Sequence, residues 1–150
     1  MSGLLINLLG CAHCQTHYLY LEVEGQSIYR HLSGEQPCLY AMQDVAAVKV
    51  ETDLWLILQE RFLLTDEQKH YIVGLASRDA RIDSTEAYKL LGAIVSLIKD
   101  HSNVDALRVN SILRSMFKRM VLDNGAIVKV EAHPWCASLF NAPLVQDTSP

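Results

Sequence analysis

The sequence predicts an α+β fold, with an antiparallel N-terminal sheet followed by three helices and a returning C-terminal strand. Three observations lead to this prediction. Up to residue 64, several stretches alternate apolar and polar side chains, the pattern of half-buried strands. From Thr65 onward, apolar residues recur with helical spacing, and each such segment follows a sequence that is typical of a helix N-terminus. After a turn at 123–125, the alternation that is typical of a strand returns in 126–132.

The predicted sheet begins with the apolar segment 4–10 and continues with a hairpin. Apolar and polar residues alternate through 18–24, which indicates a strand with one buried face. Gly25 and Gln26 supply a turn into the second strand, 27–32. We therefore expect these two strands to pair.

A second hairpin is our interpretation of the next apolar stretches, 45–50 and 54–64. The first of them alternates, as a strand does. The second contains five consecutive apolar residues at 54–58, so its pattern also suits a buried helix.

Two helices are predicted next, and each is preceded by a sequence that can cap a helix N-terminus. Thr65 and Gln68 form a capping box, and Asp83 with Glu86 offers a similar start for the segment AYKLLGAIVSLIK. That segment is apolar on nearly every side, which indicates a central helix. Gly92 lies in its middle, where glycine costs about 1 kcal/mol relative to alanine. We expect another part of the backbone to approach closely there.

The third helix is predicted over 103–121, and the strand 126–132 follows it. Its apolar stripe has clean helical spacing: Val109, Ile112, Leu113, Met116, Phe117 and Met120. The turn at 123–125 ends this helix.

Composition and charge indicate one globular domain over 1–140, with a loose tail at 141–150. The chain has 150 residues, of which 50% are hydrophobic and 20% charged, enough to bury a core without metal or disulfides. A net charge of −4 excludes overall attraction to nucleic acid or anionic lipid, so any basic face must be local.

The cysteines are expected to be reduced, because the sequence indicates a cytoplasmic protein. The N-terminal apolar run has no preceding Lys or Arg and is too short for a signal peptide, and no segment is long enough for a membrane helix. In a reducing compartment Cys11, Cys14, Cys38 and Cys136 would be free thiols or metal ligands.

A zinc site is predicted from two pairs of residues near opposite ends of the chain. Cys11 and Cys14 have the two-residue interval by which one turn of backbone presents two thiolates to zinc. His133 and Cys136 repeat this interval and would complete a Cys3His set. A late strand beside the first strand would bring the two pairs together.

Other interpretations of the same residues stay open. His13 and His17 are local substitutes as metal ligands, and Gln15 stands where zinc knuckles commonly have glycine. Buried cysteines also often pack as small hydrophobic residues. A strand that runs directly into the CAHC segment also occurs in redox dithiols, although the residues that follow do not have the pattern of a helix.

A basic face on the predicted helix 103–121 is the second candidate site. Arg108, Arg114, Lys118 and Arg119 lie opposite its apolar stripe, where they could bind an acidic protein surface or nucleic acid. The order of two helices and a strand resembles the general arrangement of a winged helix. The simpler explanation is that cations complement the helix dipole.

No catalytic set converges in the sequence, and no phosphate loop or nucleophile motif is present. We therefore expect a small intracellular regulatory or adaptor domain that binds another protein, with structural zinc as its cofactor. One alternative is a nucleic-acid-binding regulator that uses helix 103–121. The other is a thiol- or metal-dependent enzyme.

Overall fold

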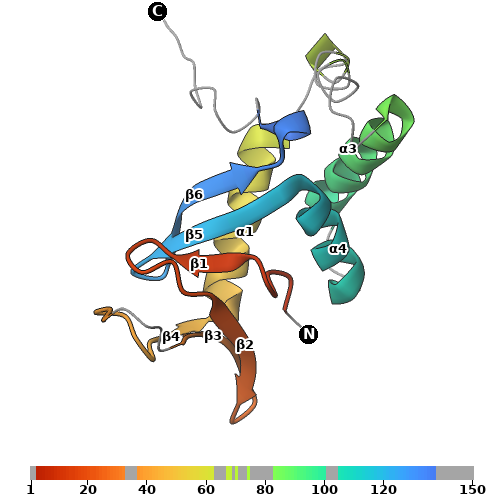
Figure 1. Cartoon of the computed structure of the whole chain (residues 1–150). Coiled ribbons are helices and arrows are strands. Elements are labelled where there is room, and N and C mark those ends of the chain that lie inside the picture. Colours follow the sequence, from red (N-terminus) through yellow and green to blue (C-terminus); the bar gives the residue numbers. More distant parts are fainter. Residues whose placement is uncertain are drawn as a thin grey trace, which may run out of the picture.

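Two three-stranded sheets and three α-helices form the part of the chain that the structure describes (Figure 1). This computed structural model describes residues 3–32, 37–62, 67, 68, 70, 74, 83–100 and 105–137. The predicted α+β class is confirmed, as are the antiparallel N-terminal sheet and the late strand. The predicted helix start at Thr65 and the tail at 141–150 lie outside the described residues.

The N-terminal sheet is antiparallel and has the strand order β2-β3-β4. Its strands are β2 (Tyr18–Val23), β3 (Gln26–His31) and β4 (Asp44–Ala46). The predicted hairpin is confirmed, but its turn lies one residue earlier than predicted, so that Tyr18 is opposite His31 and Val23 is opposite Gln26. Its two turn residues, Glu24 and Gly25, both have positive φ (51° and 80°), which matches the right-handed twist of the paired strands.

The second sheet has the order β1-β5-β6 and combines parallel with antiparallel pairing. Its strands are β1 (Leu9–Cys11), β5 (Phe117–Asp123) and β6 (Ala126–Ala132). β1 runs parallel to β5, and β6 pairs antiparallel with the other edge of β5. The late strand is therefore separated from the first strand by β5, contrary to the predicted layout.

The predicted second hairpin is wrong, because most of its sequence forms the helix α1 (Ala47–Phe62), which follows β4 directly. Burial recurs along α1 with the spacing of one helical face: Ala47, Val50, Glu51, Leu54, Leu58 and Phe62. Within the apolar run, Leu54 and Leu58 are fully buried while Leu56 is 57% exposed. The apolar residues 54–58 thus lie on different faces of a helix and do not form a buried strand.

The predicted third helix ends five residues early, since α4 spans Ala106–Met116 and β5 begins at Phe117. Phe117 is already extended (φ −119°, ψ 141°), although its N–H still bonds to the carbonyl of Leu113. Phe117 and Met120 continue the helical spacing by coincidence and are buried on the strand instead. The burial of Met120, Val121 and Leu122 in succession is typical of a central strand.

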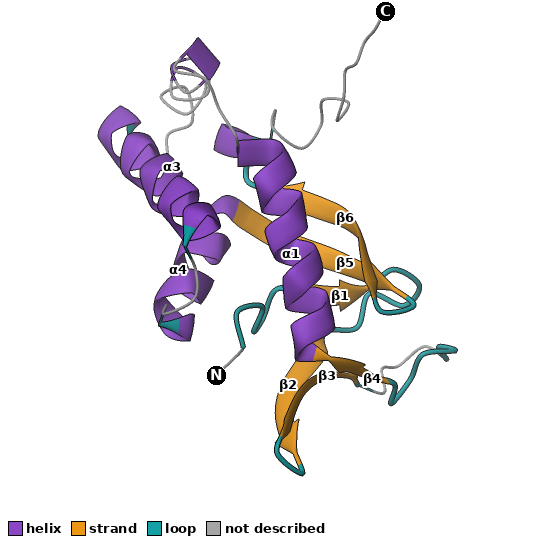
Figure 2. Ribbon diagram, turned by 180° about the vertical axis from the view of Figure 1, so that it is seen from behind, coloured by secondary structure: helices purple, strands orange, loops and turns teal. Residues whose placement is uncertain are grey.

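The helix α1 covers one face of the β1-β5-β6 sheet (Figure 2). In Figure 2, α1 crosses this face, and α3 (Ser84–Lys99) and α4 lie beside it. The predicted start of α3 is confirmed, because the Asp83 side chain accepts a hydrogen bond from the N–H of Glu86. The buried core lies between these helices and the sheet.

The N-terminal segment before β1 is a series of turns rather than the predicted strand, and Asn7 has a φ of 65°. Side chains from three elements satisfy its backbone, and the one from β3 is the Tyr29 hydroxyl, which accepts from the Leu5 N–H. The buried Glu51 carboxylate accepts hydrogen bonds from the N–H groups of Gly3 (3.0 Å) and Leu4 (3.2 Å) and from the Tyr29 hydroxyl (2.7 Å). From α4, Asn110 donates to the carbonyls of Leu4 and Ile6.

The expected close approach at Gly92 is not present in the described part of the chain. A Cβ at this position would have no heavy atom within 4 Å. Gly92 instead borders a groove between α3 and α4.

We expect Gly92→Ala to stabilise the protein by up to about 1 kcal/mol, because it restores helix propensity without a clash. Denaturant unfolding measures this change. The neighbouring substitution Ala93→Gly is the matched control and should lower the free energy of unfolding by a similar amount. A less stable Gly92→Ala protein would show that something does occupy this space.

We expect Glu51→Ala to lower the free energy of unfolding by about 3 kcal/mol, because it leaves buried backbone and hydroxyl donors without their acceptor. Glu60, which is exposed on the same helix, provides the control Glu60→Ala. Equal effects of the two substitutions in thermal or chemical unfolding would contradict the role of Glu51.

Candidate metal centre

Four metal-ligating side chains meet at the junction of the two sheets: Cys11, Cys14, His31 and Cys38. Their ligand atoms all lie within 4.8 Å of one another, and no other such group of three or more occurs among the described residues. The sulfurs of Cys11 and Cys38 are 3.7 Å apart, and the Cys14 sulfur is 3.2 Å from His31 Nε2. Two thiolates bound tetrahedrally to zinc at about 2.3 Å would be about 3.8 Å apart. The cluster is therefore close to the geometry of a metal site.

The first two ligands lie on a tight turn that begins at the end of β1. The Cys11 N–H donates to the Thr16 carbonyl, and the Cys11 carbonyl accepts from the Gln15 N–H, each at 3.0 Å. Gln15 has a φ of 62°, so this position adopts the left-handed conformation for which glycine is usual. The Ala12 N–H bonds to the Leu122 carbonyl and holds the turn against β5. The sulfurs of Cys11 and Cys14 consequently lie on the same side of the turn.

His31 ends β3 and is completely buried. Its Nδ1 lies 2.6 Å from the carbonyl oxygen of Leu32. Because a carbonyl only accepts, Nδ1 must carry the proton, which leaves the lone pair on Nε2 directed at Cys14. Such a hydrogen bond from the second ring nitrogen is the usual companion of a metal-bound histidine. The buried ring of Tyr18 packs edge-on against the imidazole.

Cys38 comes from a loop that returns to β3. The Met42 N–H donates to the His31 carbonyl, and the His31 N–H donates to the Gln43 carbonyl. Within the loop, the Ala41 N–H bonds back to the Cys38 carbonyl. These backbone bonds bring the half-buried Cys38 thiol beside the buried Cys11 thiol.

The thiols of the cluster have unequal acidity. Partial burial acts to raise the pKa of Cys14, but hydrogen bonds from Thr16 and the neighbouring thiols outweigh it and lower this pKa to about 6. At Cys38 the backbone of Tyr40 acts to lower the pKa, but desolvation and the two nearby thiols raise it above its ordinary value. Three thiolates this close would repel one another, and a bound divalent cation would remove the repulsion.

The structure brings together only half of the predicted ligand set. Cys11 and Cys14 belong to the cluster, whereas His133 and Cys136 do not. The His133 N–H bonds to the carbonyl of Met116, just before β5, while Cys11 pairs with Leu122 near its end. At about 3.3 Å per residue, Phe117 and Leu122 are roughly 17 Å apart along this strand. The two predicted pairs therefore lie at opposite ends of the sheet, and His31 and Cys38 complete the cluster instead.

Cys136 has a structural environment. It is fully buried, its thiol donates to the Met116 carbonyl at 3.2 Å, and burial raises its pKa to about 12. His133 Nε2 lies 3.1 Å from the carbonyl of Arg114. These contacts attach the end of β6 to the end of α4.

The two alternative histidines also lie outside the cluster. His13 lies on the turn between the first two ligands, but its Nε2 contacts the carboxylate of Asp123 at 3.1 Å. His17 is exposed where the turn leads into β2. Among the described residues, neither the His13 ring nor the His17 ring contacts a sulfur of the cluster.

The sequence contained a signal for His31 that we did not use. In a hairpin with a two-residue turn at Glu24 and Gly25, Tyr18 must pair with His31. Tyr18 follows the turn that carries Cys14, so a hairpin with its turn one residue earlier than predicted returns His31 to the cysteine pair. No comparable signal was available for Cys38, whose position depends on the conformation of a loop.

The predicted basic residues do not share one helix face. Arg108 and Arg114 are on α4, but Lys118 and Arg119 are on β5, where Arg119 pairs with Glu131 at 3.1 Å. The single face assumed for helix 103–121 is therefore wrong, and nucleic-acid binding stays an untested prediction.

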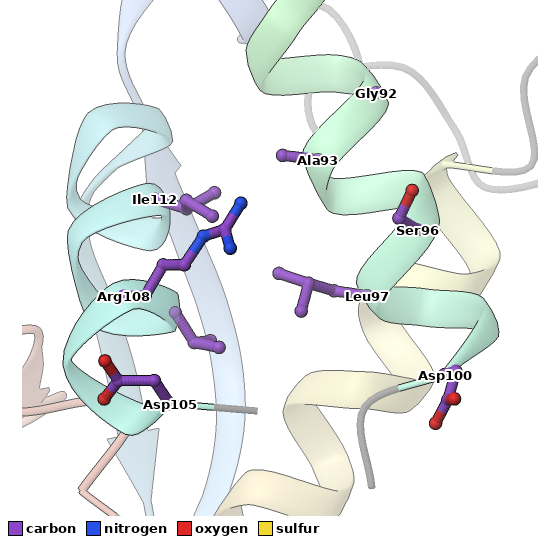
Figure 3. Close-up of a pocket in the computed structure, with 9 residues that line it drawn as sticks. Gly92, Ala93, Ser96, Leu97, Asp100, Asp105, Arg108 and Ile112 are labelled. Atoms are coloured by element: carbon purple, nitrogen blue, oxygen red, sulfur yellow. The ribbon is translucent and has the colours of Figure 1, made fainter. Parts of the chain in front are cut away.

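The groove between α3 and α4 contains one of these basic residues. Figure 3 shows Arg108 extending from α4 toward α3 in this groove, which has a volume of about 490 Å³. None of the metal-ligating residues lines it. The groove and the cluster are therefore separate features.

We expect Gln15→Gly to keep the metal cluster and to raise the free energy of unfolding by up to about 1 kcal/mol, because glycine adopts positive φ without strain. Gln15→Val should lower it, since a β-branched side chain is least tolerated there. Chemical unfolding of the two variants measures both effects. If the valine variant were as stable as the glycine variant, this turn would not have the described conformation.

Comparisons of the chain with protein-family models, with curated proteins and with solved structures found no match. In the described part of the chain, no helix has both the length and the apolar character needed to cross a membrane. The chemistry of the Cys3His cluster is accordingly inferred from its own residues.

Proposed function

We propose that this chain is a small regulatory or adaptor domain that binds another protein and is stabilised by a structural zinc ion. The observation that supports this proposal most strongly is the cluster of Cys11, Cys14, His31 and Cys38. Three sulfurs and one imidazole nitrogen are a ligand set that zinc commonly takes in structural sites.

A structural role is favoured over a catalytic one by the number of ligands. Four protein ligands complete tetrahedral coordination, whereas catalytic zinc keeps one position for water or substrate. Cys11 and His31 are also fully buried, which limits access of a substrate to that side of the ion.

A metal ion at this cluster would connect three segments that are otherwise joined mainly by backbone hydrogen bonds. These segments are the end of β1, the end of β3 and the loop that carries Cys38. Since β1 and β3 belong to different sheets, the ion would fasten the two sheets together. Such binding free energy contributes directly to folding free energy.

Two exposed side chains beside the cluster support binding to another protein. Leu39 and Met42, on the loop that carries Cys38, are 91% and 56% exposed. Apolar side chains held outward in this way can contact an apolar surface of a partner. None of the four cysteines forms a disulfide, as is usual for proteins of a reducing compartment, and we include a cytoplasmic location in the proposal.

The zinc content of protein purified without a metal-affinity tag tests the proposal. Elemental mass spectrometry should find one equivalent in the wild type and in His133→Ala, and much less in His31→Ala and Cys38→Ser. His133→Ala is the matched control, because it removes an imidazole outside the cluster.

Either of two results would contradict the proposal. One is a wild-type protein that contains no zinc and takes up none on reconstitution. The other is loss of zinc from His133→Ala but not from His31→Ala, which would favour the terminal ligand set.

A further inference from the structure

We propose that Asp123 is a positioning residue of the metal centre, which joins the two ligand-bearing loops through one carboxylate oxygen. This inference rests on the proposed metal centre. Asp123 is the last residue of β5 and lies outside the cluster of ligand atoms. It would therefore act on the metal through other side chains.

Two side chains converge on the same oxygen of Asp123. His13 Nε2 lies 3.1 Å from Oδ1, and the Tyr40 hydroxyl donates to Oδ1, also at 3.1 Å. The rings of His13 and Tyr40 contact each other, with centroids 5.2 Å apart. The three side chains form a connected group on the outside of the cluster.

Each partner of Asp123 is close in sequence to metal ligands. His13 lies between Cys11 and Cys14, and Tyr40 is two residues after Cys38. One carboxylate thus contacts both the turn that supplies two ligands and the loop that supplies a third. Of the described contacts on this side, loss of this carboxylate would leave only the one between the His13 and Tyr40 rings to join the two segments.

The sheet explains why Asp123 occupies this position. Cys11 is paired with Leu122, and the Ala12 N–H continues the ladder to the Leu122 carbonyl. The residue after Leu122 must therefore lie beside the turn that follows Cys11. Groups that hydrogen-bond directly to metal ligands typically change metal affinity by about 10- to 100-fold when removed. Asp123 acts one contact further out, so we expect an effect at the lower end of this range.

Zinc affinity of the full chain, measured by competition with a chromophoric chelator, tests this inference. Asp123→Ala should weaken zinc binding about 10-fold. Asp123→Asn should stay within about threefold of the wild type, because its carbonyl oxygen can still accept from both partners. Recovery by asparagine would show that hydrogen bonding, rather than charge, is what Asp123 contributes.

Glu131→Ala is the matched control. The Glu131 side chain is 32% exposed, against 39% for Asp123, and its ion pairs are with Arg119 on the neighbouring strand β5 and with Lys129 on β6 itself. It makes no described bond to either ligand-bearing loop, so zinc affinity should change less than about threefold.

A double-mutant cycle separates positioning from a general loss of stability. Tyr40→Phe should weaken zinc binding in the wild-type background but add little in Asp123→Ala, because the bond it removes is already absent.

The absorption spectrum of the cobalt-substituted protein provides a second measurement. The bands that arise from thiolate coordination should change in Asp123→Ala, because the thiolates are less firmly positioned, and should match the wild type in Asp123→Asn.

The outcomes distinguish this inference from the proposed function. A wild-type chain that binds no zinc would overturn both. Normal zinc binding by the wild type and equal affinity in Asp123→Ala would overturn only the role of Asp123. Additive effects of Tyr40→Phe and Asp123→Ala would also overturn it, since the two residues would then act independently.

Discussion

The parallel pairing of β1 with β5 determines what surrounds the candidate metal centre. Only three residue pairs form this contact, from Leu9 with Met120 to Cys11 with Leu122. Because the strands are parallel, their C-terminal ends lie at the same end of the sheet. There the turn after β1 meets the turn between β5 and β6 (Figure 1). The antiparallel β6 must then finish at the opposite end of the sheet. His133 and Cys136 follow β6 directly and are therefore excluded from the cluster.

The first residues of the chain link the parts of the molecule, although few of them are in regular structure. Before β1, Glu51 and Asn110 hold the N-terminal turns against α1 and α4. After β1, Cys11 and Cys14 meet His31 from the other sheet. A short strand of three residues is therefore anchored by buried polar contacts at one end and by the proposed metal at the other. Both anchors satisfy groups that would be unfavourable if buried alone.

Local patterns predicted much of the fold, and long-range pairing explains most of what was missed. The hairpin and the start of α3 depend on turn and capping residues that are near in sequence. The change from α4 to β5 occurs without glycine or proline, and Phe117 and Met120 happen to extend the helical spacing. The ligand set depended on which strand lies beside β1, and no local pattern specifies that partner. Cys11 and Cys14 were identified because their spacing is local, whereas Cys38 required the tertiary structure.

The most direct test of the metal centre is zinc X-ray absorption spectroscopy on the zinc-loaded wild-type protein. The structure leads us to expect three sulfur ligands and one nitrogen ligand, with zinc to sulfur distances of about 2.3 Å. A first coordination sphere with two or fewer sulfurs, or one dominated by oxygen, would contradict a centre formed by Cys11, Cys14, His31 and Cys38.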